Sequence, residues 1–461
     1  MLNFYLFFSG ACLLLAIIRP KLGLWLMLVV GLLADPVRKL TPGNPVYIQV
    51  VFVSILALIY LAHRKTYSRD QSLLNVFPTM RAPLQLFFVF LVINAIRPLL
   101  INMAYLPLVV YSSVQYVGLI MAAKFGFDLV KDEDTIIKFT DVFIITLLPF
   151  MISILFHFWG FDKAYPVLRV MGMEGGKWLK YYYGEAPLSM LCGLFRNPEG
   201  MGWYAMMVSV SAFFLLVRKK RSLWSMLYYI GVFILSSACV LFSGRRKFFL
   251  GVFVFILIFI ILSMRKNIKK GIIYLVLFMI ASGGFFYYIG RTEGSAIYLK
   301  TSKSGVEEAE DRFQSGVLGS IKWAIRRDGF FGKGLGTTAQ GARHLGVAEG
   351  GSYIESGPGK VVSELGIPGF IAFVMIFLAY ISGAYRKVAK GMFKDIGEVA
   401  GVFLLSLVLT NIIEFAISHQ IYGDPLVAVL TGLMFGFLLA VPRIRQGKTI
   451  VHIKQEPQSN A

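Results

Sequence analysis

The sequence predicts an all-α integral membrane protein whose helices cross the bilayer many times. Hydrophobic residues make up 57% of the 461 residues and charged residues only 15%, and apolar runs recur at lengths that span about 30 Å of hydrocarbon. The runs are continuous, whereas the strands of a membrane barrel alternate apolar and polar positions. Because backbone groups inside lipid must be paired within their own segment, we expect a single helical membrane domain over 1–461.

The apolar runs predict about twelve to thirteen transmembrane helices. The first two runs are separated only by Arg19, Pro20 and Lys21, so they form a tight hairpin or merge, and the second is short for a crossing. The side on which the N-terminus lies depends on that choice. The expected spans are residues 2–18, 22–35, 46–62, 83–101, 104–123, 137–158, 200–217, 223–242, 247–263, 271–289, 360–384, 397–416 and 423–441.

The distribution of Lys and Arg predicts which loops face the cytoplasm. Basic residues are retained in short cytoplasmic loops, and with these spans the dense basic segments all fall on one face: 63–69, 218–221, 265–270, 385–394 and a tail over 442–461. The net charge of +21 is thus explained by topology and anionic lipid headgroups, without a nucleic-acid partner. The opposite, extracytoplasmic face carries a loop over 159–199, a large loop with helical segments over 290–359, and the short connections 243–247 and 417–422.

The motifs of nucleotide-dependent and metal-dependent enzymes are missing. In a Walker A loop, Gly-Lys is followed by Ser or Thr, but here Gly334 follows Gly332 and Lys333. The histidines form no HExxH motif. Three scattered cysteines indicate neither a disulfide framework nor a zinc site. Asp132 and Asp134 spell a DxD, but an acidic turn before a helix near Ile136 explains them better. We therefore expect no cofactor and no metal.

A set of arginines on the extracytoplasmic face predicts an anion site. Arg245 and Arg246 lie between two apolar runs, Arg196 precedes a span, and Arg312 belongs to an amphipathic stretch of the large loop. A guanidinium suits a diphosphate because its planar fork donates two parallel hydrogen bonds and stays protonated. Each arginine alone could instead extend to lipid headgroups. That alternative is weaker for the adjacent pair, which departs from the distribution of basic residues elsewhere.

Other polar residues near this face are secondary candidates. Asn411 and Glu414 lie on one face of a span, and a carboxylate inside a membrane is a functional candidate. His419 follows shortly afterwards, and Arg97 stands near the extracytoplasmic end of its own span. A structural ion pair and a substrate contact are both open for these side chains. The glycine-rich 332–338 could cradle phosphate with its amides or form a simple turn.

Four motifs in order resemble the bacterial O-antigen ligase and O-antigen polymerase superfamily. They are GLFRNPEGMGWYAM (193–206), SGRRKFFLG (243–251), RFQSGVLGSIKWAIRRDGFFGKGLGTT (312–338) and ESGPGKVVSELGIPGF (355–370). The resemblance covers roughly 190–375 by motif and most of the chain by helix layout. Each motif is degenerate alone, and their order and common face carry the similarity.

The resemblance implies a metal-independent glycosyltransferase of the bacterial cytoplasmic membrane, acting at its outer face on glycans linked to undecaprenyl pyrophosphate. A flippase and a chain-length regulator are implied as partners. Arg245 or Arg246 matches the family arginine that follows a Ser-containing helix junction, and Arg312 matches the arginine that precedes a tryptophan, here Trp323. The arginines would then take the place that a metal fills in other transferases.

The chain departs from the family at one position. Family ligases commonly carry a histidine nine residues before the Glu of Glu-Leu-Gly; here that Glu is Glu364, and Glu355 stands nine residues before it. Glu355 could activate or orient an acceptor hydroxyl as a general base, serve as an arginine counter-ion, or be a solvated carboxylate. His344 in the same loop is the reserve base.

The missing histidine favours a polymerase that joins lipid-linked repeat units into a surface polysaccharide. The first alternative is a ligase or oligosaccharyltransferase that moves a finished glycan to a lipid or protein. The second is a secondary transporter of an anionic solute. Transporters often show two repeated halves with broken helices at the midplane, and no internal repeat is visible in this sequence.

Overall fold

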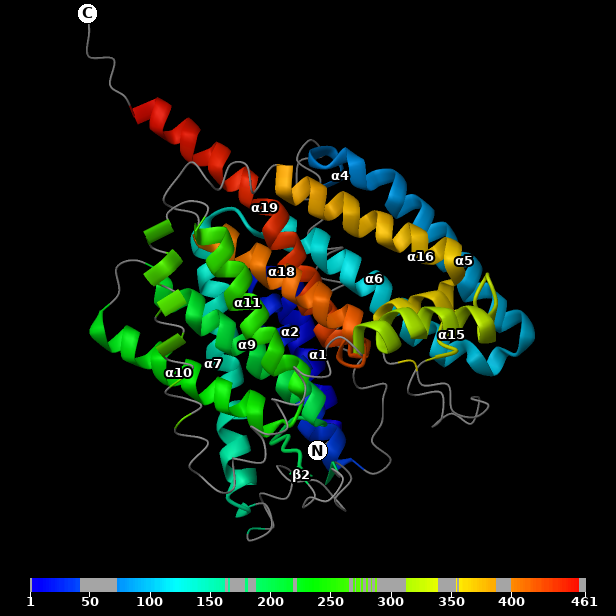
Figure 1. The fold of residues 1–461 in the computed structure, drawn as a ribbon, viewed down its shortest axis with the longest axis horizontal. Coiled ribbons are helices and arrows are strands. Elements are labelled where there is room, and N and C mark those ends of the chain that lie inside the picture. Colours follow the sequence, from blue (N-terminus) through cyan, green and yellow to red (C-terminus); the bar gives the residue numbers. More distant parts are fainter. Residues whose placement is uncertain are drawn as a thin grey trace, which may run out of the picture.

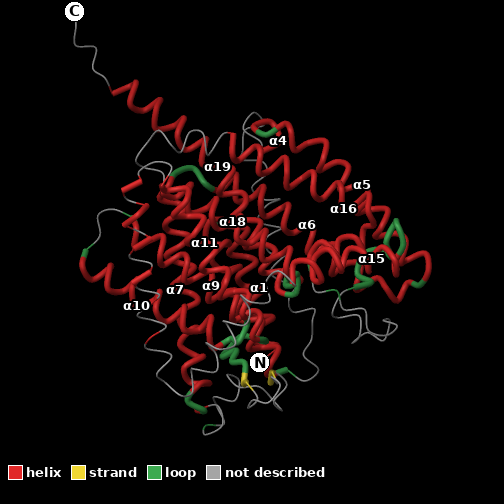
Figure 2. Tube along the Cα trace, viewed as in Figure 1, coloured by secondary structure: helices red, strands yellow, loops and turns green. Residues whose placement is uncertain are grey.

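The protein is a polytopic helical membrane bundle, as the sequence predicts (Figures 1 and 2). The computed structural model describes residues 2–41, 73–161, 165, 179–180, 188–218, 222–264, 268–269, 271–273, 275–276, 279–280, 283, 287, 312–338, 354, 356–386 and 399–455. Within these residues, nine helices are long and apolar enough to cross a bilayer. The predicted span 46–62 and most of 271–289 lie outside the described residues.

The helices of the described segments follow the predicted spans in order, although the second and the last end five and fourteen residues beyond the predicted ends. They are α1 (Leu2–Ile18), α2 (Pro20–Leu40), α4 (Leu73–Val76), η3 (Pro78–Met80), α5 (Arg81–Ile101), η4 (Met103–Tyr105), α6 (Leu106–Leu129), α7 (Glu133–Phe158), α9 (Pro198–Val217), α10 (Leu223–Phe242), α11 (Arg246–Met264), η7 (Arg312–Leu318), α15 (Gly319–Asp328), α16 (Gly357–Ala384), α18 (Val399–Ile417), η10 (Ile421–Gly423) and α19 (Pro425–Gln455).

Side-chain caps start several of these helices where the sequence has Asp, Asn or Ser. Asp132 accepts a hydrogen bond from the Thr135 amide at the start of α7, which confirms the structural interpretation of the DxD. Asn197 caps α9 ahead of a proline at its first position, and Ser356 caps α16, where Pro358 is the second residue. An oxygen acceptor at the N-cap and a proline directly after it are both typical of helix starts.

The N-terminal hairpin brings the end of α2 to the loop before α9. Proline opens α2, which runs five residues beyond the predicted span 22–35. The Lys39 Nζ atom donates to the Gly193 carbonyl at 2.6 Å. The chain therefore starts at the end of the bundle where the short strands β1 (Leu179–Lys180) and β2 (Leu188–Ser189) pair antiparallel (Figure 1). The α19 helix leaves the bundle at the other end and continues into the predicted tail.

Burial separates central from peripheral helices. In the most apolar window of each helix, 94% of α19 and 83% of α9 are buried inside the protein, against 28% for α5, α10 and α16. Large apolar side chains stay exposed on the peripheral helices, including Val92 of α5 and Leu378 of α16. These surfaces are the ones suited to contact lipid, because nothing in the described part of the protein covers them.

Small residues let α6 and α19 approach closely. A Cβ atom added at Gly436 would meet the Ala123 carbonyl, and one added at Gly432 would meet the Leu119 carbonyl. Gly126 of α6 faces the α19 backbone in the same way. Glycines four residues apart are a common packing device between membrane helices because they allow backbone contact. This pair of helices forms one wall of the pocket described below.

The described parts of the loops predicted to be extracytoplasmic meet at one end of the bundle. Residues 329–338 dock on α5 and α16: the Lys333 amide donates to the Ser363 carbonyl at 2.8 Å, and the Leu335 amide donates to the Asn94 carbonyl at 2.8 Å. Two amides of the glycine-rich loop are thus already used, which favours the structural turn over a phosphate cradle. The end of the bundle where these loops meet is called the polar end below, and it is formed by residues 190–199, 243–247, 329–338 and 418–424.

Candidate functional site

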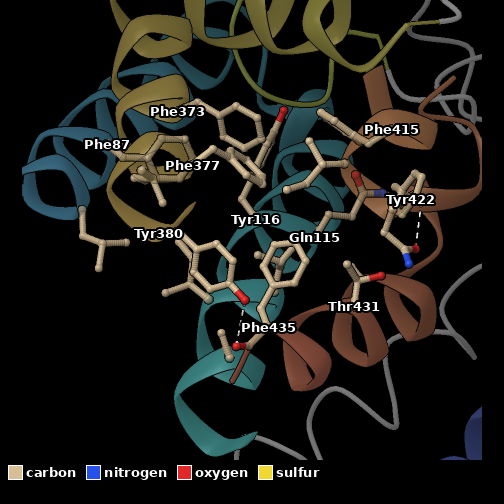
Figure 3. Close-up of a pocket in the computed structure, with 18 of the residues that line it drawn as sticks. Phe87, Gln115, Tyr116, Phe373, Phe377, Tyr380, Phe415, Tyr422, Thr431 and Phe435 are labelled. Atoms are coloured by element: carbon tan, nitrogen blue, oxygen red, sulfur yellow. Dashed lines mark hydrogen bonds between the residues drawn. The ribbon is translucent and has the colours of Figure 1, made fainter. Parts of the chain in front are cut away.

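A large pocket opens between the α5–α16 pair and the helices α6, α18 and α19 (Figure 3). The space between its walls, with the open mouth included, is about 1140 Å³, and its lining is mostly apolar and aromatic. It is lined by α16 residues from Lys360 near the start of the helix to Tyr380 near its end, on both sides of the kink at Gly366. The pocket therefore extends along most of the length of α16. Its aromatic lining includes Phe87, Tyr116, Phe373, Phe377, Tyr380, Phe415 and Phe435.

Polar side chains gather at the end of the pocket that lies nearest the polar end of the bundle. Lys360 is 6% exposed, and its Nζ atom donates to Gln115 Oε1 at 2.8 Å. Asn411 Oδ1 accepts from Trp203 Nε1 at 3.1 Å and from the Tyr422 hydroxyl at 3.0 Å. His419 also lines the pocket. One end of an otherwise apolar pocket thus carries a cation and several hydrogen-bonding groups.

The connection between α18 and α19, residues 418–424, joins this pocket to the charged groups around it. Its Gly423 carbonyl accepts from Gln115 Nε2 at 2.6 Å and from the Tyr111 hydroxyl at 3.0 Å. Its first residue, Ser418, accepts from Lys247 Nζ at 2.8 Å, and its last, Asp424, faces Arg196. The pocket and the two ion-pair groups described next therefore share a single segment.

The junction between α10 and α11 forms the first ion-pair group. Gly244 turns the chain with a positive φ of 64°, a conformation that glycine adopts without strain. Beyond the turn, Arg245 Nη1 lies 3.0 Å from Glu199 Oε1, and Lys247 Nζ lies 2.5 Å from Glu199 Oε2. Arg246 begins α11 and is buried. Glu199 in the first turn of α9 therefore neutralises part of this cationic junction.

Arg196 forms the second group with two carboxylates. Its backbone amide donates to Asp35 Oδ2 at 3.1 Å, and its Nη2 atom lies 3.9 Å from Asp424 Oδ2. Burial raises the pKa of Asp424, Arg196 opposes that rise, and Asp35 adds to it. Burial tends to lower the pKa of Arg196, but Asp35 and Asp424 outweigh it and raise that pKa overall. The guanidinium is therefore held in its charged form.

Two further buried carboxylates hold the loop 329–338 in place. Glu364 is fully buried and accepts from Ser112 at 3.2 Å, from Tyr116 at 2.9 Å and from Thr338 at 3.0 Å. Asp328 pairs with Arg327 at 2.6 Å and accepts a short hydrogen bond from Ser363. Both carboxylates are occupied by donors from neighbouring elements, so they act in the structure as anchors for the loop.

The structure brings some of the predicted site residues together and separates others. Arg196, Arg245 and the buried Arg246 lie around the start of α9, within the polar end. Arg97 instead donates to the Phe331 and Gly332 carbonyls at 2.8 and 2.9 Å, so it fastens the loop. Among the described side chains, none of the predicted arginines lines the pocket.

Of the remaining candidates, some belong to the described residues and others lie outside them. Glu414 is buried in α18, where a Cβ atom added at Gly251 would meet its Oε1, and His419 lines the pocket. Arg312 is the first residue of η7, which leads into α15, and its side chain is outside the described set. Glu355 and His344 lie outside the described residues altogether.

Sequence reasoning missed the residues whose importance comes from their neighbours. Lys360, Gln115, Glu199 and Asp424 each gain a partner from a distant part of the chain. A lysine inside an apolar span is itself a signal, and Lys360 stands at the start of such a span. The partners could not be inferred, because they depend on how the helices pack.

No protein-family model matches the chain, and no curated protein is significantly similar to it. In the described segments, no group of three or more His, Cys, Asp or Glu side chains is placed to hold a metal ion. Function has therefore to be inferred from the pocket and from the charged groups at its end.

Proposed function

We propose that this protein is a glycosyltransferase of the bacterial cytoplasmic membrane that polymerises lipid-linked oligosaccharide units into a surface polysaccharide. The donor and acceptor would be glycans carried on undecaprenyl pyrophosphate. The observation that supports this most is the pocket, which is apolar along the helices and polar and cationic where it reaches the polar end. A carrier lipid has the same division, with a long apolar chain and a charged head.

The charge distribution supports an active site on the outer face of the membrane. Four cations gather at the polar end, namely Lys39, Arg196, Arg245 and Lys247. By the order of the spans, the dense basic segments that mark cytoplasmic loops fall at the opposite ends of the helices. Glycans on undecaprenyl pyrophosphate are the substrates expected on that face from the family resemblance. The polar end is therefore where donor and acceptor would meet.

In the proposed reaction, an acceptor hydroxyl attacks the anomeric carbon of the lipid-linked donor. The new bond joins the acceptor oxygen to that carbon, the bond from the carbon to the diphosphate oxygen breaks, and the lipid diphosphate leaves with the bonding electrons. Glu355 would take the hydroxyl proton. The cationic junction of Arg245, Arg246 and Lys247 would stabilise the charge that builds on the departing diphosphate, with Arg196 and Arg312 contributing.

Three variants test this proposal in cells that depend on the protein for their polysaccharide. Arg245→Ala, Arg246→Ala and Glu355→Gln should abolish polymer while single units are still exported. Arg218→Ala removes an arginine at the opposite end of α9, where it faces the exposed Asp134 at 3.6 Å, and should leave polymer unchanged. Polymer at the wild-type level in all three test variants would contradict the proposal, and immunoblots must show that each variant reaches the membrane.

The lipid-linked intermediates of a deletion strain separate the polymerase from the alternatives. Loss of a polymerase leaves single units on the carrier, whereas loss of a ligase leaves long chains on it. A secondary transporter would instead move an anionic solute into liposomes and would transfer no glycan. Accumulation of long lipid-linked chains would replace the polymerase assignment by the ligase one.

A further inference from the structure

Lys360 is a buried cation on the pocket wall that has no carboxylate partner in the described structure. It lies in the first turn of α16 and is 6% exposed. Its Nζ atom donates one hydrogen bond, to Gln115 Oε1 at 2.8 Å. An ammonium carries three donors, and buried charges are normally paired. Two donors and the positive charge of Lys360 are therefore left to be satisfied from the pocket.

The nearest acid along the same helix does not neutralise this charge. Glu364 lies one turn further along α16, and its two oxygens accept from Ser112, Tyr116 and Thr338. The other cations of the polar end differ in this respect, since Arg245 and Lys247 share Glu199 and Arg196 faces Asp424. Within the described residues, Lys360 is thus set apart both by its missing counter-ion and by its place on the pocket.

Thr431 contributes a polar atom without a hydrogen-bond partner to the pocket lining. Thr431 of α19 is 3% exposed, and its Oγ1 atom makes no hydrogen bond. It belongs to the pocket lining and lies between Phe435 and Tyr422 (Figure 3). A threonine in a helix can usually bond a carbonyl of its preceding turn. An unused hydroxyl on α19 and an ammonium on α16 that has no carboxylate partner in the described structure suit a ligand with several acceptor oxygens.

The rest of the lining indicates what is attached to those oxygens. Beyond the polar residues, α5, α16 and α19 contribute side chains such as Leu84, Ile376 and Phe435. A free inorganic anion would gain nothing from these walls. An apolar chain covalently joined to an anionic head would bury its chain there, at roughly 25 cal/mol per Å² of apolar surface, while its head reached Lys360.

We propose that Lys360 binds the phosphate group of a lipid whose chain occupies the pocket. The inference deepens the proposed function and rests on it for the identity of that lipid, a phosphorylated polyprenol. Phosphate oxygens accept strong charge-assisted hydrogen bonds from an ammonium, and Thr431 adds a neutral donor. The ion pairs of Arg245 and Arg196 lie next to the pocket through residues 418–424, so they face the head of the lipid from the solvent side.

Lipid binding to the purified protein, followed by native mass spectrometry, tests the inference. The ligands are undecaprenyl phosphate, the uncharged undecaprenol and inorganic pyrophosphate. Lys360→Met keeps the apolar stem and removes the charge, Lys360→Arg restores a cation, and Lys322→Met removes an exposed lysine from α15 as the matched control. We expect Lys360→Met to weaken undecaprenyl phosphate binding at least about tenfold, while Lys360→Arg and Lys322→Met stay within about threefold of the wild type.

The two other ligands separate charge recognition from apolar binding. Undecaprenol should bind the wild type and Lys360→Met equally, because it has no phosphate for the ammonium to contact. Inorganic pyrophosphate should bind far more weakly than the lipid. Undecaprenyl phosphate affinity unchanged in Lys360→Met would overturn the inference, as would an equal loss of undecaprenol binding. Tight binding of pyrophosphate alone would assign the cation to a free anion instead of a lipid.

Thermal stability distinguishes a ligand-binding lysine from a structural one. Removing an unpaired buried charge relieves a desolvation cost, so the thermal midpoint of ligand-free Lys360→Met should equal or exceed that of the wild type. A lower midpoint together with unchanged lipid binding would show a structural role and overturn the inference. In Ile376→Trp, which narrows the apolar part, both undecaprenyl phosphate and undecaprenol should bind less.

The outcomes also separate this inference from the proposed function. If Lys360→Met loses the phosphorylated lipid but the wild type transfers no glycan, the lipid site stands and the polymerase assignment fails. If the wild type polymerises glycan and Lys360→Met binds the lipid normally, the function stands and the lipid site fails.

Discussion

Replacing Glu199 by glutamine removes the one carboxylate that Arg245 and Lys247 share. Its Oε1 lies 3.0 Å from Arg245 Nη1 and its Oε2 lies 2.5 Å from Lys247 Nζ. The Glu199 and Lys247 side chains are only 8% and 11% exposed, while Arg245 is 24% exposed. The substitution keeps the volume of the side chain but leaves a nearly buried ammonium without its counter-ion.

The expected loss in the free energy of unfolding is about 3 kcal/mol. Breaking a buried ion pair by removing one partner costs about 3 to 5 kcal/mol, and the Lys247 pair belongs near the lower limit because Ser418 still accepts from the ammonium. The partly exposed Arg245 pair adds less than about 1 kcal/mol. Loss of a carboxylate from the first turn of α9 adds roughly 0.5 kcal/mol, and the glutamine oxygen recovers a similar amount by accepting one hydrogen bond.

Unfolding of the purified protein in mixed micelles with increasing denaturing detergent measures this loss. Asp134→Asn is the matched control because its pair with Arg218 spans 3.6 Å with Asp134 73% exposed, and it should cost less than about 1 kcal/mol. A double variant of Glu199→Gln and Lys247→Met should be more stable than the sum of the single variants predicts. If Glu199→Gln costs no more than Asp134→Asn, or if the two variants add, the ion pair is not the buried contact described here.

Three further substitutions test the packing and the polar network. Gly436→Ala places a methyl group against the Ala123 carbonyl of α6 and should lower the free energy of unfolding by about 2 kcal/mol. The control Gly231→Ala has open space around its Cβ position and should be neutral or slightly stabilising. Equal thermal midpoints for the two variants would refute the close approach of α6 and α19. Asn411→Leu leaves Trp203 and Tyr422 without their acceptor and should cost about 2 to 4 kcal/mol in the same unfolding assay, while Thr410→Val, whose hydroxyl bonds only its own helix, should cost much less. Glu364→Gln deprives at least one of Ser112, Tyr116 and Thr338 of its acceptor and should loosen the loop 329–338. Trypsin should therefore cut after Lys333 faster than in the wild type. An unchanged cleavage rate would speak against the anchoring role of Glu364.

The membrane helices could be predicted because each continuous apolar run has to satisfy its own backbone hydrogen bonds in lipid. That requirement is local, and α10 and α18 accordingly lie within about two residues of the predicted spans. The prediction was weaker for α2, where Asp35, Arg38 and Lys39 interrupt the apolar run. These residues remain helical because Arg196 and Gly193 supply partners, and those partners come from a segment about 155 residues away in sequence.

The candidate site could be predicted only in outline. The order of spans predicted that several arginines gather at one end of the bundle, and Arg196, Arg245 and Arg246 lie at the polar end. Their carboxylate partners were not predicted. Neither was the pocket, whose walls come from α5, α6, α16, α18 and α19, because a cavity is defined by the surfaces of several helices and by no single stretch of sequence.

The amino-acid sequence by itself determined that this chain is a helical membrane protein and where its described membrane helices lie, because hydrophobicity acts on each segment separately in lipid and water. Only the tertiary structure decided which cations are neutralised. Arg245 and Lys360 are both basic residues at the ends of apolar spans, yet one meets Glu199 and the other meets an amide and an open pocket. The difference arises because the energy of a buried charge depends on which groups packing brings within a few ångströms.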